Sequence, residues 1–140
     1  MLNEQVRQIM TQNPVTAGPS NSIAEVTELM VTNGLNQLPV VENGKLVGMI
    51  TTHDLWKDSL NPDVNHTDIS SIMSTKVIKI APKDKVGTAA ELFMDRRFKT
   101  LPVVNLDNQL KGVVTAFDVM RLTLKKEYPT PILYKEVING

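Results

Sequence analysis

The sequence contains no cysteine, which excludes a disulfide framework, a thiolate metal site and a cysteine nucleophile. It also lacks long hydrophobic runs. No stretch reaches the roughly 18 apolar residues of a membrane span, and the N-terminus has no apolar signal-peptide core. An excess of one charge is missing too, because 15 Lys and Arg balance 15 Asp and Glu. That balance disfavours a phosphate backbone as partner. We therefore expect a cytoplasmic protein that binds neither membrane nor nucleic acid.

Patterns for catalysis and metal binding are equally scarce. The two histidines, His53 and His66, are too few and too far apart in the sequence for a recognisable metal site. No Ser-His-Asp arrangement, phosphate-binding glycine-rich loop or zinc-protease signature occurs. We expect no enzyme activity, no catalytic residue, no metal and no cofactor.

What the sequence does contain is an internal repeat. Ile9-Met10 returns as Ile72-Met73, and the Leu-Pro-Val-Val that begins at Leu38 returns at Leu101, each 63 residues later (72 − 9 and 101 − 38). The segment Gly48-Met49-Ile50-Thr51-Thr52-His53-Asp54 returns, with substitutions, as residues 112–118, which is 64 residues later. One copy therefore carries an extra residue, in the loop where residues 42–45 face residues 105–109.

Helix signals occur at matching places in the two copies. Ser22 and Glu25 fit a capping box, and Gly34 can end the helix that follows in a left-handed conformation. Arg97 takes the place of Gly34 in the second copy, so that helix must end differently or be strained. The expected apolar stripes are Ile23, Val26, Leu29 and Met30 in the first copy, and Val86, Ala90, Leu92 and Phe93 in the second.

Strand signals complete each copy. Residues 15–17 and 77–80 are expected as short extended segments, and Asn43-Gly44 predicts a tight hairpin between residues 38–41 and 45–50. Helical spacing follows Thr51. Each copy thus predicts β-α-β-β-α. The fold class is α/β (α+β), with two such repeats related by a pseudo-twofold axis that cover each other's apolar sheet faces.

The expected organisation follows the chain. Residues 1–60 form the first repeat together with a short N-terminal helix over residues 3–10, and residues 61–67 form a polar linker. Residues 68–122 form the second repeat, and residues 123–140 form a C-terminal extension. This extension is either a strap over a neighbouring surface or a docking tail for a partner.

Two units with Ile-Met near the start, Leu-Pro-Val-Val midway and Gly-x-apolar-Thr-x-x-Asp at the end resemble the CBS-domain family. A tandem pair resembles a Bateman module, and the resemblance covers roughly residues 6 to 122. It implies two clefts between the repeats, each suited to an adenine nucleotide.

In such a cleft, a Thr at a helix start offers a hydroxyl and backbone N–H groups to phosphate, and a nearby Asp can accept hydrogen bonds from ribose. The same Thr-x-x-Asp pattern can instead cap the helix and bind nothing. By the resemblance, segments 15–16 and 78–79 bracket the adenine, although strand burial explains them equally well. The candidate nucleotide-binding residues are Thr51, Asp54, Thr115, Asp118, Val15, Thr16, Ile78, Lys79, Pro39, Pro102, His53 and Lys99.

Some of these candidates differ between the copies. His53 lies where relatives carry a basic residue near phosphate, but Phe117 takes its place in the second copy, so the two sites cannot be equivalent. Lys99 is the best cation of the second copy. Arg96 and Arg97 fit a solvated helix end better than a phosphate site. The prolines at 39 and 102 either line the cleft or sit at a strand edge.

The resulting expectation is a regulatory, energy-sensing module that binds AMP, ADP or ATP, with AMP or ATP foremost, and signals to an unidentified effector protein. Apolar helix faces around Leu55, Trp56, Val119 and Met120 predict a homodimer. The alternative is a structural or dimerisation module whose degenerate clefts bind no ligand, which the departures at Phe117 and Arg97 favour.

Overall fold

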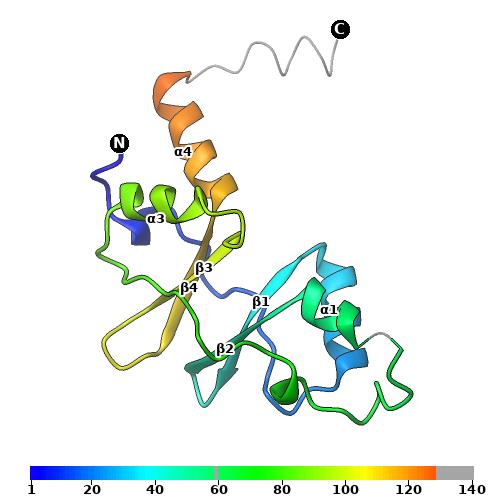
Figure 1. Ribbon diagram of the computed structural model, residues 1–140. Coiled ribbons are helices and arrows are strands. Elements are labelled where there is room, and N and C mark those ends of the chain that lie inside the picture. The colour runs from blue at the N-terminus through cyan, green and yellow to red at the C-terminus, as the bar shows by residue number, and fades with distance from the viewer. Residues whose placement is uncertain (59, 129–140) are drawn as a thin grey trace, which may run out of the picture.

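The computed structural model describes residues 1–58 and 60–128. Two helix-hairpin-helix units follow one another along the chain, each with one two-stranded antiparallel sheet (Figure 1). The first comprises α1 (Ile23–Asn33), β1 (Gln37–Glu42), β2 (Lys45–Thr51) and α2 (Thr52–Lys57). The second comprises α3 (Val86–Phe93), β3 (Thr100–Val104), β4 (Leu110–Thr115) and α4 (Ala116–Glu127). Two 3₁₀ turns, η1 (Val6–Gln8) and η2 (Ile69–Ser71), precede them.

The ends of the first long helices confirm the local predictions. At the start of α1, Glu25 N donates to Ser22 Oγ and Ser22 N donates to Glu25 Oε1, both at 3.1 Å. Gly34 ends the helix with φ of 63°. In the second copy α3 stops at Phe93, three residues before the counterpart of Asn33, because no glycine is there to end a longer helix. The buried alanine of α3 is Ala89, so the prediction of Ala90 was wrong by one residue.

The two hairpins also follow their turn residues. Asn43 and Gly44 both have positive φ (53° and 79°), as a two-residue turn between twisted strands requires. In the second hairpin the loop runs over residues 105–109, with Asn108 at φ of 61°. There the Asn105 carboxamide oxygen accepts the backbone N–H groups of Asp107 and Gln109. The extra residue of the second copy therefore lies in this loop, as predicted.

The first predicted strand of each copy is reduced to one bridge beside a proline. Ala17 N donates to Pro39 O (3.0 Å) and Val41 N donates to Ala17 O (2.8 Å), as in a parallel ladder. The next bond would need an N–H on Pro39, which proline lacks, so the ladder stops. Ile80 makes the same two bonds beside Pro102 in the second copy. Each of the predicted short extended segments, 15–17 and 77–80, therefore makes only a single bridge, for the same reason in both copies.

The segments that precede each repeat pack on the other repeat. Val6 belongs to the hydrophobic cluster of the second repeat, whereas Ile69 belongs to that of the first. Thr11 forms a bridge to Val113 and its counterpart Ser74 forms one to Met49. Figure 1 shows the N-terminal segment, in blue, beside α3. Each contact that the first segment makes with the second repeat therefore has an equivalent, made by the second segment with the first repeat. The two repeats are thus related by a pseudo-twofold axis.

The segment that precedes each repeat in the chain thus packs on the other repeat. Residues 1–11 are first in the chain but pack on the second repeat, and η2 packs on the first. The predicted helix over residues 3–10 is only the three-residue turn η1. The predicted boundaries at 60, 67 and 122 stay predictions. The proposed C-terminal extension begins inside α4, and residues 129–140 lie outside the described residues.

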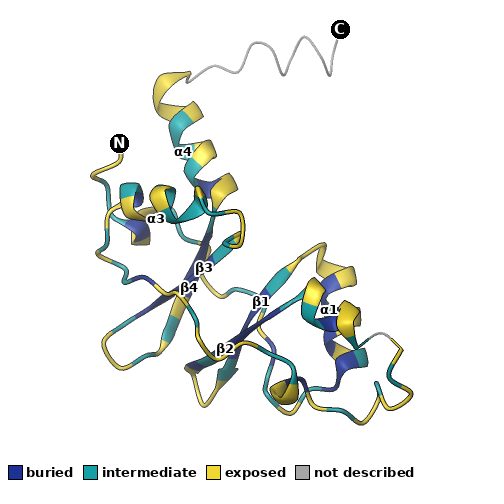
Figure 2. Ribbon diagram, in the orientation of Figure 1, coloured by how far each residue is buried: buried dark blue, intermediate teal, exposed yellow. Residues whose placement is uncertain are grey.

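The core consists of the strand faces and the helix stripes that cover them (Figure 2). Leu38, Val40, Leu101 and Val103 of the repeated Leu-Pro-Val-Val motif are at most 1% exposed. Gly48 within β2 and Gly112 within β4 allow the segments that precede the other repeat to approach closely. A Cβ on Gly112 would lie 2.6 Å from Thr11 O, and one on Gly48 would lie 2.8 Å from Ser74 O. The methionine of each Ile-Met pair also lies against the glycine of the other copy.

Candidate functional site

The two Thr-x-x-Asp segments lie at the same end of the two hairpins. Thr51 pairs with Gln37, and Thr115 pairs with Thr100, which is the counterpart of Gln37. The side chain of Gln37 accepts a hydrogen bond from Thr100 N (2.9 Å), so these strand ends meet across the boundary between the repeats. The fold therefore brings both Thr-x-x-Asp segments to this boundary, one on each side.

In the first repeat, the residues form a complete capping box. Thr51 Oγ1 accepts from Asp54 N (3.1 Å), and Asp54 Oδ2 accepts from Thr51 N (2.9 Å). These bonds hold the strand-to-helix junction before α2. The Asp54 side chain is half-buried, and among the residues described its Oδ1 has no hydrogen-bond partner. One carboxylate oxygen thus stays available to a hydroxyl donor.

In the second repeat, the same box is more enclosed. Asp118 Oδ2 accepts from Thr115 N (2.8 Å) and from Thr115 Oγ1 (3.1 Å). Its Oδ1 lies 3.7 Å from Arg121 Nη1, and the side chain is only 7% exposed. Arg121 in turn lies over the ring of Phe117, 4.7 Å from its centroid. Both aspartates cap helices, but Asp118 has less freedom to meet a ligand.

The candidate adenine-bracketing residues lie along the proline-interrupted edges. The bridge from Ala17 to Val40 places Val15 beside Leu38, one step from the end of the strand where Thr51 lies. No hydrogen bond to the carbonyl of Val15 or Ile78 occurs within residues 1–58 and 60–128. Val15 is half-buried, whereas Thr16 and Ile78 are exposed.

The remaining members of that edge are already engaged. Lys79 Nζ donates to Asn108 Oδ1 (2.8 Å), in the loop at the far end of the hairpin. Pro39 and Pro102 are less than 2% exposed, and each carbonyl accepts from the bridging residue. Their rings therefore belong to the core, where the missing N–H ends the ladder.

The candidate cationic residues differ between the copies. His53 is exposed and stacks on Trp56, with ring centroids 6.1 Å apart. Lys99 is exposed, and its backbone N–H donates to Gln37 Oε1 (3.3 Å). Arg97 is paired with Asp95 at 2.7 Å and its side chain is 80% exposed, as expected for a solvated helix end. Hydrogen bonds from the Arg97 side chain and backbone N–H lower the pKa of Asp95 to about 2.

Sequence reasoning missed Gln37. Its amide lies on the boundary between the repeats and contacts residues 97, 99 and 100 of the other copy. Aligning the two copies places Gln37 opposite Thr100, and this replacement of a short hydroxyl side chain by a long amide was visible in the sequence. The partners of that amide, however, lie at least 60 residues away.

Two hollows occur in the structure, and the first includes Thr52 of the first Thr-x-x-Asp segment in its lining. An apolar groove of about 980 Å³ runs between α1 and α2, and Met30, Val31, Leu35, Leu55 and Trp56 are among its lining residues. A second hollow, of about 780 Å³, lies between the N-terminal segment and β4, with Arg7 and Lys111 on its wall. Neither is lined by a candidate nucleotide-binding residue.

In the described part of the chain, no group of three or more His, Asp or Glu side chains could hold a metal ion. None of the described helices has the length and hydropathy needed to cross a bilayer.

Comparison with known proteins identifies the family. The profile of the CBS domain matches residues 6–55 and 69–125, so the chain belongs to the CBS-domain family. The CBS domain-containing protein YhcV of Bacillus subtilis is 30% identical over 115 residues, which is 81% of each chain. The uncharacterised protein MJ0188 of Methanocaldococcus jannaschii is 29% identical over 130 residues, or 91% of this chain. The chain spans 47% of the length of that protein and of a second relative, MJ1225.

Solved structures agree with the fold. CBSX2 of Arabidopsis thaliana in complex with AMP superimposes with a TM-score of 0.79 at 26% identity, covering 89% of this chain and 98% of CBSX2. The CBS domain pair of MJ0100, in complex with 5'-methylthioadenosine and S-adenosyl-L-methionine, gives a TM-score of 0.75 at 32% identity, covering 87% and 97%. The predicted family and the mixed α+β fold of two CBS repeats are thus confirmed.

Proposed function

We propose that this chain is a regulatory module that binds an adenine nucleotide in two clefts between its repeats. The first cleft is the one beside Thr51 and Asp54, and the second is the one beside Thr115 and Asp118. The ligands of the solved neighbours support this proposal, because AMP, 5'-methylthioadenosine and S-adenosyl-L-methionine all contain adenosine. Their shared features are an adenine ring and a ribose with two hydroxyl groups.

The observation that carries the proposal is that a carboxylate and a free backbone carbonyl lie near the same end of the hairpin in each repeat. Each repeat has a carboxylate behind a threonine cap, and each has a backbone carbonyl that its proline leaves without a ladder partner. A carboxylate accepts hydrogen bonds from ribose hydroxyls, and a backbone carbonyl accepts one from the adenine amine. The pseudo-twofold axis supplies this set twice.

The two clefts should differ in affinity. Asp54 is half-buried and its Oδ1 has no hydrogen-bond partner among the described residues, whereas Asp118 is 7% exposed and lies near Arg121. To accept two ribose hydroxyls, Asp118 must expose its carboxylate and give up part of its contacts with Thr115 and Arg121. We expect the first cleft to bind the ribose more tightly, with His53 near its phosphate and Lys99 supplying the stronger phosphate contact in whichever cleft it enters.

Calorimetric titration with AMP, ADP and ATP tests the proposal. Asp54→Ala, Asp118→Ala and the double variant should each lose binding at the altered cleft. Loss of a charge-assisted hydrogen bond typically costs about 1.5–3 kcal/mol, or roughly ten- to a hundredfold in affinity. The fold should persist in each variant.

Asp84→Ala is a matched control. Asp84 Oδ2 accepts the N–H of Ala81, three residues earlier, in the same pattern as Asp54, but outside both proposed clefts. It should lose about 1 kcal/mol of stability and no nucleotide affinity. If the two cleft variants behave like this control, their aspartates only cap helices. If the parent binds no nucleotide, the chain is instead a structural module with degenerate clefts.

Self-association is a second part of the proposal. The apolar groove between α1 and α2 ends at Trp56, which is 70% exposed, and α4 carries Phe117, Met120 and Leu124, which are 56–61% exposed. These positions are spaced three and four residues apart and so form one exposed stripe along the helix. A second copy that covers these faces would form a homodimer. Energy sensing in the cytoplasm and an effector protein that responds to the nucleotide complete the proposed role.

A further inference from the structure

Gln37 is the point at which the symmetry of the two repeats is broken. It begins β1 as Thr100 begins β3, and the two positions are equivalent under the 63-residue shift (100 − 37). Each pairs in its hairpin with the threonine that caps the following helix, Thr51 or Thr115. A direct connection between the two proposed clefts therefore passes through these two strand starts.

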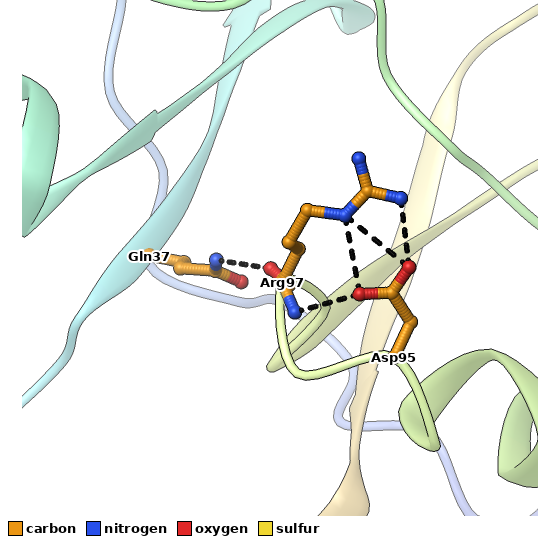
Figure 3. A network of polar contacts seen from close by, with 3 residues as sticks. All are labelled: Gln37, Asp95 and Arg97. Carbon is orange, nitrogen blue, oxygen red and sulfur yellow. Dashed lines mark hydrogen bonds and ion pairs between the residues drawn. The ribbon is translucent and has the colours of Figure 1, made fainter.

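The Gln37 amide makes three hydrogen bonds, all to the other repeat. Its Oε1 accepts from Thr100 N (2.9 Å) and Lys99 N (3.3 Å), and its Nε2 donates to Arg97 O (3.3 Å). Figure 3 shows the last of these, with the amide directed across the boundary. The amide orientation follows from its partners, because backbone N–H groups only donate and a carbonyl only accepts. Thr100 has too short a side chain to return such bonds.

The segment that Gln37 contacts is itself held by an ion pair. The Arg97 guanidinium donates to both carboxylate oxygens of Asp95 at 2.7–3.2 Å, and Arg97 N also donates to Asp95 Oδ1 (3.0 Å) (Figure 3). This turn replaces the glycine-ended helix of the first repeat. Because these hydrogen bonds hold the turn in one conformation, a shift of Gln37 moves the turn as a unit. What Gln37 fixes is therefore the position of Lys99 and of the β3 start.

From this arrangement we propose that Gln37 is a positioning residue through which occupancy of one cleft raises the affinity of the other. This proposal rests on the proposed nucleotide function. A nucleotide in the first cleft orders Thr51 and, through the strand pair, Gln37. An ordered Gln37 holds Lys99 and Thr100 in place, so the second cleft loses less freedom on binding. Linkage requires the same effect in the opposite direction.

Gln37→Ala removes the connection without replacing any of the residues proposed to contact the nucleotide. In the parent, calorimetry with AMP should resolve two binding steps, the second about two- to tenfold tighter than expected for independent sites, as one or two hydrogen bonds allow. In Gln37→Ala the two steps should become independent. Thr100→Ala, which alters the equivalent position and keeps its backbone N–H, is the matched control and should retain the coupling.

Hydrogen exchange supplies a readout without ligand. The Thr100 amide should lose protection in Gln37→Ala and keep it in Thr100→Ala. Unchanged coupling in Gln37→Ala, or independent sites in the parent, would overturn the role of Gln37 while leaving nucleotide binding intact. Absence of AMP, ADP and ATP binding by the parent would overturn the proposed function and this inference with it.

Discussion

Replacing Gly112 by alanine tests the exchange of segments between the repeats. A Cβ at this position would lie 2.6 Å from Thr11 O and 2.9 Å from Met10 Sδ. The methionine side chain can turn aside, but the carbonyl belongs to the backbone that bridges to β4. That bridge consists of Thr11 N to Val113 O (2.8 Å) and Val113 N to Thr11 O (3.0 Å). The methyl group must therefore push the N-terminal segment off the second repeat or strain β4.

Overpacking of this kind costs about 1–3 kcal/mol. For a chain of 140 residues this corresponds to a melting temperature lower by roughly 4–12 °C. The thermal melt should be followed together with hydrogen exchange at the Thr11 and Val113 amides, which should lose protection. Gly18→Ala is the control, because its Cβ would meet only Asn21 Oδ1 at an ordinary 3.6 Å. It should leave the melting temperature unchanged or slightly raised.

Equal stability of Gly112→Ala and Gly18→Ala, with Thr11 still protected, would refute the close approach of the N-terminal segment to β4. The mirror variant Gly48→Ala gives an independent repetition. Its Cβ would lie 2.8 Å from the Ser74 carbonyl, so it should release the segment after η2 from β2 by the same mechanism.

Three further outcomes follow from single contacts. Trp56→Glu places a charge on the exposed end of the apolar groove and should convert a dimer to monomer in sedimentation at micromolar concentration; a monomeric parent would remove the homodimer from the proposal. Arg97→Ala should raise the pKa of Asp95 from about 2 toward 3.8 in an NMR titration, since its hydrogen bonds to Arg97 hold that pKa down. The Asp95 ion pair therefore stabilises the fold above pH 3.8 and is lost as the pH falls toward 2, and an unchanged titration would contradict this cause. Lys126 Nζ lies 2.8 Å from Glu4 Oε1 and lowers the Glu4 pKa, so Lys126→Ala should raise that pKa toward 4.5 and reduce amide protection near Glu4.

Much of the local structure could be read from single stretches of chain. The capping boxes at Ser22, Thr51 and Thr115 each need only two residues three positions apart. The turn at Asn43-Gly44 and the helix end at Gly34 need only residues that tolerate positive φ. The 63-residue repeat then supplied the family and the number of units.

Other features depended on groups that the chain order keeps apart. The short extended segments 15–17 and 77–80 are limited to one bridge each because their neighbour in the sheet is a proline, whose missing N–H ends the ladder. Which strand a segment lies beside is decided by the tertiary structure. Residues 1–11 pack on the second repeat through a contact with Gly112, about 100 residues downstream. A contact over that separation could not be read from a local stretch of sequence.

The candidate site divides in the same way. The sequence by itself determined that each repeat would have a threonine and an aspartate at a strand-to-helix junction, because the spacing that forms a cap is local. Only the tertiary structure decided that Asp118 would be nearly buried and Asp54 half-buried. Only it decided, too, that Gln37 would face the other repeat. Exposure and contacts over 60 residues depend on how the two repeats pack, and identical local motifs can therefore have different surroundings on the two sides of one axis.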